Sequence, residues 1–541
     1  MNLLVRSVLV LGILFGLLFA AAMGVLAYYH LPLVWGVGIA LGVVLLQYLL
    51  GPFFIQLMFR IRWASPQELA PGVASYLYGA CSEAGVPVPR IGLIDDGNPN
   101  AFTFGHYPRD ARLVLTTGLT GMLDEEEQKA VVGHELGHIA HWDFAVMTLA
   151  AVVPMVLYMI YRFTLRSGRR SSREGGGYAV AVGIIAFVAY IVSEYIVLFL
   201  SRVREYYADQ FSGDSTRNPN ALASGLVKIA YGLARAPREA KQGERRGAFG
   251  GAELGRSLGI FDPRAAGRLA LAAAGATTST GVSATAMVDA MKWDLWNPWA
   301  AWYELGSTHP LPAKRIRALE RLAVTHGQPE LFDFPYQQPE SYWDEFLVDW
   351  LTHVLPWIGA AVGGAVGALL WSVHIGGPML IAGCAVLGLS LGGLVKVFRS
   401  HPTAAFPPAT VERLVGEVKV SGIRSIPCTL DGRIIGRGVP GLYWSEDLVL
   451  QDESGFIVLD YRQPLRILEI LFGLFRARNL VGGAARAVGW FRRAPVPFLE
   501  LLYVDIEGAG RQRSWFYTAS LALAVIGVIA GLGLAGIGLM L

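Results

Sequence analysis

Seven apolar runs constrain the fold of this 541-residue chain more than any other feature of its sequence. A helix that crosses the hydrocarbon core of a bilayer needs about 20 apolar residues, with about 17 as the lower limit. The composition agrees, because 53% of the residues are hydrophobic and only 16% are charged. The runs cover residues 7–28, 33–59, 145–161, 178–200, 354–373, 377–395 and 516–541, of which the third is the shortest. We therefore predict a multi-pass α-helical membrane protein.

The first run has two interpretations. Arg6 precedes it, and the alanines at 20–22 lie near its end, as in a cleaved signal peptide. The run is long for the apolar core of such a peptide, however, and a second run follows at once. A signal anchor is therefore the favoured interpretation.

The distribution of Lys and Arg predicts the orientation in the membrane. Seven spans place the larger polar segments, residues 60–144, 201–353 and 396–515, on one side, whereas the turns 28–32 and 374–378 contain no Lys or Arg. Because cytoplasmic segments carry the excess of basic residues, we predict a multi-pass protein of the inner (cytoplasmic) membrane whose polar segments face the cytoplasm. The basic residues at the membrane edges of that side are Arg6, Arg60, Arg62, Arg202, Arg204, Lys396 and Arg399.

The loop between the third and fourth runs disagrees with this orientation. Its arginines at 162, 166, 169, 170 and 173 would face outward. Either these charges are tolerated, or residues 145–200 dip into the bilayer without crossing it. The sequence leaves both possibilities open.

The segment His134-Glu135-Leu136-Gly137-His138 carries the clearest chemical signal. Two imidazoles four residues apart on a helix project from one face and can bind one Zn²⁺, with Glu135 beside the metal-bound water. This is the H-E-x-x-H pattern of zinc peptidases, in which the carboxylate takes a proton as the water attacks a peptide carbonyl. An acidic first turn at 124–127 supports a helix here. Two histidines on an ordinary surface helix are the less favoured alternative.

A catalytic zinc has three protein ligands, so a further donor must come from elsewhere. Glu205 is the best candidate, because it follows an apolar run where a helix leaving the membrane would continue. Asp209, one turn later, is placed to accept the spare ring N–H of a zinc-bound histidine. The alternative is a solvated helix end in which Arg202 and Arg204 contact headgroups. His141 has the wrong spacing for a third ligand and is predicted to lie behind the ligands or at the membrane interface.

Taken together, these motifs resemble those of the HtpX-like membrane metallopeptidases, which share a gluzincin superfamily with the CAAX prenyl endopeptidases. The resemblance covers about residues 1–325 and is specific, because separated motifs occur in the family's order. Besides the zinc helix and the Glu205 segment, they are Asn98-Pro99-Asn100-Ala101-Phe102, Thr116-Thr117-Gly118-Leu119, and Ser307-Thr308-His309-Pro310 followed by Arg315-Ile316.

The resemblance implies a role for each matching residue. His134, His138 and Glu205 would bind one Zn²⁺ per chain, Glu135 would be the general base, and Asp209 would support a ligand. His309 and Arg315 would contact the transition state or the substrate, although His309 is equally well explained as a helix-start residue before Pro310 at N1. Asn100, Ala101 and Phe102 would lie beside bound substrate.

The function that this resemblance implies is a zinc-dependent endopeptidase acting on membrane or misfolded proteins in quality control. One alternative is a CAAX-type prenyl-protein protease, which shares the chemistry. Another is a catalytically silent scaffold, which the intact Glu135 argues against. Because every matching motif precedes residue 325, we expect catalysis to need only that part of the chain.

The soluble part of the matching region is predicted to have an α+β fold. We predict strands at 89–95 and 111–117, helices at 219–236, 264–275 and 312–324, and a loop rich in Gly and Arg at 237–262.

Beyond residue 401 the pattern changes to short strands at 415–420, 448–459, 487–491 and 498–502. They predict an OB-like barrel and resemble the GIDE-type domain found beside membrane helices in some ubiquitin ligases. Cys428 is the only cysteine after Cys384, so a RING domain and ligase activity are not implied. The G-x-G-x-x-G match at 436–441 is predicted to be a turn, since no helix follows it.

The predicted fold is therefore a multi-pass α-helical membrane protein with an α+β zincin catalytic domain and a C-terminal all-β, OB-like domain. An apolar, arginine-flanked helix at 465–475 would lie on the membrane or against a partner helix. The expected partners are protein or peptide substrates, membrane lipids and a membrane protein bound through residues 401–513; the net charge of +3 gives no nucleic-acid footprint. The predicted parts are a transmembrane hairpin (1–60), the peptidase domain (61–330) with two membrane helices (145–200), a linker and hairpin (331–400), the barrel (401–513) and a last membrane helix (514–541).

Overall fold

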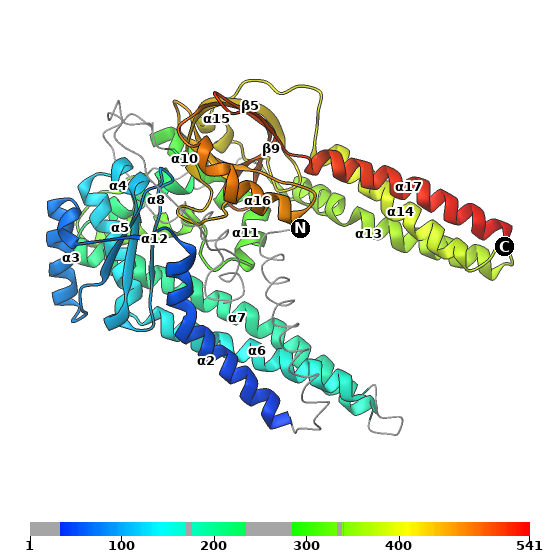
Figure 1. Cartoon of the computed structure of the whole chain (residues 1–541), viewed down its shortest axis with the longest axis horizontal. Coiled ribbons are helices and arrows are strands. Elements are labelled where there is room, and N and C mark those ends of the chain that lie inside the picture. The colour runs from blue at the N-terminus through cyan, green and yellow to red at the C-terminus, as the bar shows by residue number, and fades with distance from the viewer. Residues whose placement is uncertain (1–32, 169–175, 234–283, 333–337, 339) are drawn as a thin grey trace. The chain divides into compact units, whose positions relative to one another are not determined.

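The computed structural model describes residues 33–168, 176–233, 284–332, 338 and 340–541 (Figure 1). The predicted span at 7–28, the loop at 237–262 and the helix at 264–275 lie outside these residues. The chain forms two compact units. The first comprises residues 1–282, 301–333 and 439–443, and the second comprises residues 283–300, 334–438 and 444–541. We describe each unit by itself.

The first unit contains a four-stranded sheet in the order β1-β2-β4-β3. The central strands β2 and β4 are parallel, and β1 and β3 pair with them in antiparallel fashion. Leu113, Val114 and Leu115 of β4 are all buried, as expected of a strand covered on both faces. The predicted strands at 89–95 and 111–117 correspond to β2 and β4. The strands are β1 (Arg62–Ala64), β2 (Arg90–Ile94), β3 (Ala101–Phe104) and β4 (Arg112–Thr116).

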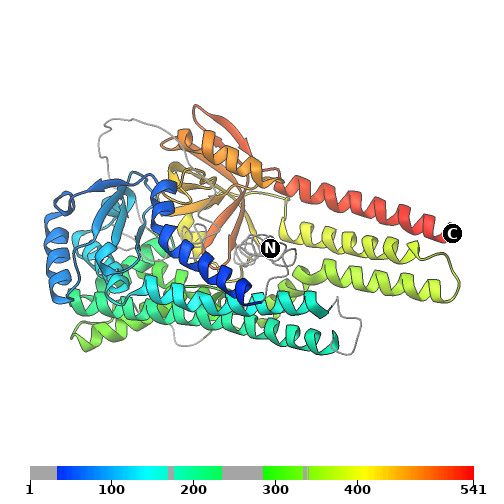
Figure 2. The ribbon, with the colours of Figure 1, turned by 60° about the horizontal axis from the view of Figure 1, so that its bottom comes forward.

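Helices surround this sheet and extend from it toward the membrane segments (Figure 2). The helix predicted at 312–324 is α12, whereas the one predicted at 219–236 ends earlier, at Ala230. The helices are α2 (Leu33–Met58), α3 (Pro71–Glu83), α4 (Thr117–Met122), α5 (Glu125–Ala140), α6 (Asp143–Gly168), α7 (Gly176–Thr216), α8 (Pro219–Ala230) and α12 (Pro312–Thr325), with α11 (Pro298–Leu305) at the border between the units.

The second unit joins a barrel to a bundle of three long helices, which lie side by side in Figure 1. Strands β5, β6, β7, β9 and β8 form a closed ring, in which only the β7–β9 pair is parallel. A helix follows β7 and precedes β8 in the chain, so the predicted OB-like barrel is confirmed. The strands are β5 (Ile426–Arg437), β6 (Leu448–Gln451), β7 (Phe456–Asp460), β8 (Ala484–Arg493), β9 (Pro497–Ile506) and β10 (Gly510–Arg513), and the helices are α10 (Ala284–Trp296), α13 (Trp343–Ser372), α14 (Met379–Ser400), α15 (Val411–Val415), α16 (Arg466–Phe475) and α17 (Phe516–Met540).

The strand predicted at 415–420 is wrong. Val415 ends α15, and the residues after it form turns. Backbone carbonyls there are satisfied by side chains of the α10 region instead of a neighbouring strand: Trp293 Nε1 donates to Val420 O at 2.7 Å and Asn297 Nδ2 to Val418 O at 2.8 Å. The G-x-G-x-x-G match begins in the last two residues of β5, and residues 438–441 form the predicted turn after it.

Helix α16 is tied by its beginning to the start of α17. Ser514 Oγ donates to Arg462 O at 2.6 Å, and Gln463 Nε2 donates to Arg513 O at 2.9 Å. The residues just before α16 therefore lie beside those just before α17. The position of α16 on the membrane or against a partner helix stays a prediction.

Five helices in the described part of the chain are long and apolar enough to cross a membrane. They are α6, α7, α13, α14 and α17, and they coincide with the last five predicted runs. The second run forms α2, in which Tyr48–Met58 is a shorter apolar segment. The protein is therefore a membrane protein with an α-helical membrane part, as predicted.

Candidate active site

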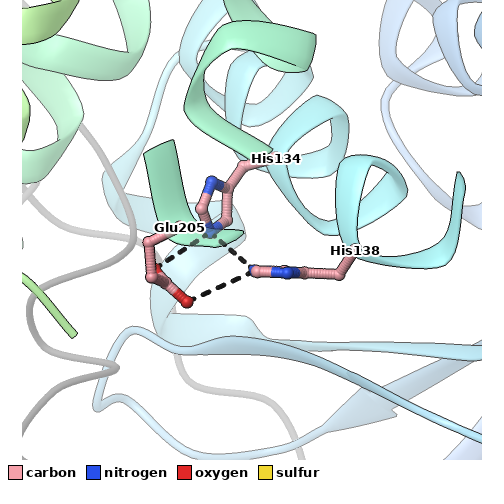
Figure 3. A group of neighbouring side chains, drawn as sticks. All are labelled: His134, His138 and Glu205. Carbon is pink, nitrogen blue, oxygen red and sulfur yellow. Dashed lines mark hydrogen bonds and ion pairs between the residues drawn. The ribbon is translucent and has the colours of Figure 1, made fainter. Parts of the chain in front are cut away.

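Helix α5 presents the two histidines from one face (Figure 3). Its start is fixed by a capping box, in which the Asp124 side chain accepts from Glu127 N and the Glu127 side chain accepts from Asp124 N. His134 is 1% exposed and His138 is half-buried. Their Nε2 atoms are 3.1 Å apart. The i, i+4 spacing thus places two ring nitrogens at one point.

Helix α7 brings Glu205 to the same point. At 41 residues it is about 60 Å long, roughly twice the thickness of the bilayer core, so its C-terminal part extends well beyond the membrane. Close packing on α5 requires Gly137, because a Cβ there would lie 2.9 Å from Ala208 Cα. One oxygen of Glu205 lies 3.7 Å from His134 Nε2, and the other lies 3.6 Å from His138 Nε2.

Each histidine is held from behind by a carboxylate. His134 Nδ1 lies 3.0 Å from Asp209 Oδ1, and His138 Nδ1 lies 2.6 Å from Asp143 Oδ2. Asp143 also pairs with Arg204. These partners assign the ring proton of both histidines to Nδ1 and leave both Nε2 lone pairs directed at the shared point. Sequence reasoning missed Asp143; its position in the first turn after the zinc helix was the available signal.

Arg315 is in different surroundings from those expected of a substrate contact. It is 1% exposed. Its guanidinium donates to both oxygens of Asp209, at 2.6 and 2.8 Å, and its Nη1 lies 3.1 Å from Glu205 Oε2. Burial alone would lower the pKa of Arg315, but Asp209 and Glu205 raise it above its ordinary value. The residue is a fixed cation that holds two carboxylates in place.

Glu135 is next to the histidines and is 5% exposed. Thr103 Oγ1, on β3, donates to Glu135 Oε2 at 2.9 Å. The hydroxyl therefore fixes one carboxylate oxygen and leaves the other available to accept a proton. Thr103 was also missed from the sequence, because it lies just after the motif that drew attention to this strand.

His309 enters the site from the segment before α12. Its Nδ1 lies 2.9 Å from Glu205 Oε2, and its side chain is 28% exposed. Arg202 holds this segment by donating to Glu304 O at 2.9 Å and Ser307 O at 2.8 Å. The helix begins at Pro312, so the helix-start explanation of His309 before Pro310 is wrong. Arg202 therefore contacts protein carbonyls here.

His141 does not join the cluster of ligand atoms. It is the C-cap of α5, where its N–H donates to Gly137 O at 3.0 Å. Its ring lies against Tyr207 and Phe211. Burial and then Arg204 lower its pKa.

Asn100, Ala101 and Phe102 lie at the start of the edge strand β3, and their side chains are buried. Asn100 N donates to Thr116 Oγ1 at 2.8 Å, and Thr116 N donates to Asn100 O at 2.9 Å. A peptide that pairs with the edge strand β3 would therefore contact the backbone of β3 and not these three side chains.

The ligand atoms of His134, His138 and Glu205 lie within 4.8 Å of one another, which suits one metal ion. Two observations test the fit. Both Nε2 atoms are acceptors, yet they face each other at 3.1 Å, a repulsive arrangement unless a cation lies between them. Among the described residues, no well-aligned hydrogen bond reaches the buried Glu205 Oε2, although it forms ion pairs with His309 and Arg315. The donor set fits a metal.

Comparison with known proteins identifies relatives of the peptidase region. The model of peptidase family M48 matches residues 70–323. A "Protease HtpX homolog" of Methanothermobacter thermautotrophicus is 40% identical over 230 residues, which are 42% of this chain and 86% of that protein. One of Aeropyrum pernix is 30% identical over 294 residues, 53% of this chain and 86% of that protein. A crystal structure of S. mikatae Ste24p is 14% identical, has a TM-score of 0.34, and is matched over 58% of this chain and 65% of that chain.

The membrane helices, the sheet and the cluster of ligand atoms define a membrane metalloprotease. The chain belongs to peptidase family M48 and is related to the HtpX proteases within it. The resemblance drawn from the motifs is confirmed for the peptidase region. The GIDE-type resemblance of the barrel stays a prediction.

Proposed function

We propose that the protein is a zinc-dependent endopeptidase that cleaves membrane or misfolded proteins at the cytoplasmic face of the inner membrane. One observation carries the proposal: His134, His138 and Glu205 converge on one point with Glu135 beside them. Membrane spans between and after the catalytic motifs, together with the excess of Arg and Lys at the membrane edges of the larger polar segments, support the location.

The distances between ligand atoms favour zinc. A tetrahedral zinc ion with Zn–N distances of about 2.0–2.1 Å separates two nitrogen ligands by about 3.3–3.4 Å. The two Nε2 atoms are 3.1 Å apart, and the Glu205 oxygens lie 3.6 and 3.7 Å from them. Two imidazoles and one carboxylate are a donor set common in catalytic zinc sites, which keep a fourth position open.

When bound, zinc supplies an activated water and polarises the scissile carbonyl. The residues of the chain do the rest. Glu135, held by Thr103, accepts the proton of the attacking water and passes it to the leaving amine. Asp209 and Asp143 keep the ring protons of His134 and His138 on Nδ1.

His309 and Arg315 have different proposed roles. His309 is part-exposed beside Glu205, so it can donate to the oxyanion that forms on the scissile carbonyl. Arg315 is enclosed and acts through Asp209 and Glu205, as a positioning residue. The edge strand β3 is the proposed place where the substrate backbone adds as a further strand, beside Asn100, Ala101 and Phe102.

Two alternatives have the same fold. A CAAX-type prenyl-protein protease would use the same residues on a prenylated C-terminal peptide, and a scaffold would use none of them. The test is the full-length chain in bilayers, assayed for metal content and for cleavage of an unfolded membrane protein and of a farnesylated peptide. Cleavage of the first substrate with one zinc per chain supports the proposal. Cleavage of the farnesylated peptide alone favours the CAAX-type alternative, and a metal-free, inactive chain favours the scaffold.

A further inference from the structure

A short loop of the C-terminal region belongs to the peptidase unit. Residues 439–443 follow β5 in the sequence but cluster with the first unit, whereas residues 438 and 444 cluster with the second. Val439 is 5% exposed and Leu442 is 2% exposed. The loop is therefore an interior part of the peptidase unit, although it lies more than a hundred residues beyond the end of the family match at 323.

The loop pairs with the residues that join α2 to β1. Arg60 N donates to Gly441 O at 3.0 Å, and Tyr443 N donates to Met58 O at 3.4 Å. Phe59 and Leu442 form an antiparallel bridge. These backbone contacts fix the register of the loop against this segment. The Arg60 guanidinium also lies over the Tyr443 ring, 4.5 Å from its centroid.

Gly441 makes the close fit possible. Its φ is 75°, a left-handed conformation that favours glycine. A Cβ at this position would lie 2.8 Å from Ile94 Cδ1 and 2.9 Å from Ile94 Cγ2. Ile94 is the last residue of β2 and is 1% exposed, so it has little room to move.

The loop is connected to the edge strand β3 through Phe59. Phe59, which pairs with Leu442, is 3% exposed, and its ring centroid lies 5.5 Å from that of Phe102 on β3. The next residue, Thr103, donates to Glu135 at 2.9 Å. Packed interiors transmit small displacements because side chains fill the space between elements. A shift of Phe59 would thus move Phe102 and the strand that carries it.

We infer that residues 439–443 are a positioning segment for substrate binding. By holding Phe59 against Phe102, the loop sets the position of β3, on which the substrate backbone is held. The inference rests on the proposed function, because it needs β3 to be the substrate strand. The peptidase unit is then completed by the C-terminal region, and residues 1–325 do not contain all of it.

Gly441→Ala in the full-length chain tests this inference. We expect KM for a peptide substrate to rise roughly 10- to 100-fold, because a small misplacement of a binding element has effects of that size. The zinc content should stay near that of the wild-type chain, since no ligand is displaced. The value of kcat should fall by a smaller factor than KM rises, because Thr103 holds Glu135 from the same strand. Gly85→Ala is the matched control: its φ is 65° and a Cβ there meets nothing within 4 Å. It carries the same backbone strain without the contact.

Two further variants separate positioning from general damage. Leu442→Ala leaves the backbone bridge with Phe59 in place, but it removes most of a side chain that is 2% exposed and adds no backbone strain. It should also raise KM, even if Gly441→Ala folds poorly. Ile94→Ala combined with Gly441→Ala removes the clashing atoms, so KM should rise less than the two single variants predict together.

The inference is overturned if Gly441→Ala and Leu442→Ala keep the KM of the Gly85→Ala control. It is also overturned if they lose zinc or kcat with unchanged KM, because the loop would then support the fold as a whole. A wild-type chain that binds zinc but cleaves no peptide would overturn the proposed function itself, and the inference with it.

Discussion

Arg315 donates to both carboxylate oxygens of Asp209, from Nη2 to Oδ1 at 2.6 Å and from Nε to Oδ2 at 2.8 Å. Its third nitrogen lies 3.1 Å from Glu205. All three side chains are at least 95% buried. The Arg315 cation therefore contacts two carboxylates, that of the proposed ligand Glu205 and that of Asp209 behind His134.

This relationship predicts a large loss of stability in Arg315→Met, because the two buried carboxylates lose the cation that they share. Removing one partner of a buried ion pair costs about 3–5 kcal/mol. Thermal unfolding of the detergent-solubilised chain, with chelator present, measures the effect. Arg315→Lys keeps the charge and loses the two-point geometry, so it should fall between wild type and Arg315→Met. Equal unfolding temperatures for all three would contradict the assigned role.

Glu135→Gln should abolish proteolysis while about one zinc per chain stays bound, because Glu135 is the proposed base and not a ligand. Loss of a general base lowers kcat by roughly 10²- to 10⁴-fold. Thr103→Val is the milder companion: it removes one hydrogen bond to Glu135, worth about 0.5–1.5 kcal/mol, and should lower kcat roughly 2- to 13-fold. Loss of zinc in Glu135→Gln would reassign the residue as a ligand.

Glu205→Ala should lose zinc as severely as His134→Ala, since each removes one of three ligands. Asp209→Ala and Asp143→Ala should weaken zinc binding only by roughly 10- to 100-fold, because they act through the histidines. Zinc content after dialysis against graded chelator ranks the four variants. A normal zinc content in Glu205→Ala would be incompatible with the proposed ligand set.

The contribution of Glu320 to the stability of the peptidase unit should fall as pH rises between about 4.5 and 7. Burial raises the pKa of Glu320 to about 7 from a usual value near 4.5. Within that window the folded chain holds a proton that the unfolded chain has released, so the folded state binds more protons and stability decreases with rising pH. Below pH 4.5 the stabilising contribution of protonated Glu320 is fully present. Above pH 7 the contribution has been lost, and stability no longer changes with pH through this group.

Glu320→Gln should remove this part of the pH dependence and make the chain more stable than wild type at pH 8. Its oxygen can still accept the hydrogen bond from Phe332 N, which is 2.7 Å in the wild type. Unfolding by urea at pH 5 and pH 8 measures the difference. The exposed Glu83→Gln should show no such change. A slope as steep in Glu320→Gln as in wild type would refute the assignment.

A chain that ends at residue 330 should bind zinc but cleave peptides poorly. The sequence alone predicts the opposite, because His134, Glu135, His138 and Glu205 are all retained. We expect the reverse, since the shortened chain lacks Leu442 and Gly441, which pair with the segment between α2 and β1. Peptide turnover per bound zinc, compared with the full chain, is the measurement. Equal turnover would support a self-sufficient N-terminal part.

Features set by local periodicity were predictable. The zinc helix is visible because an acidic N-terminus, an apolar face and two histidines follow the helical repeat, and the membrane helices are visible from run length. The alternation of apolar and polar residues at 415–420 was misleading. The backbone carbonyls of Val418 and Val420 accept hydrogen bonds from the side chains of Asn297 and Trp293, and not from a neighbouring strand. The roles of Asp143 and Arg315 were not predictable in detail, because each depends on a partner from another helix.

The sequence by itself determined the class of chemistry and the membrane helices, since residue types and their spacing within one helix carry that information. Tertiary structure decided the rest: which carboxylate stands behind each histidine, that Arg315 is enclosed, and that residues 439–443 are part of the peptidase unit. The physical reason is distance along the chain. Contacts such as Leu442 with Phe59 join residues hundreds of positions apart, and only the packing of the folded chain selects them.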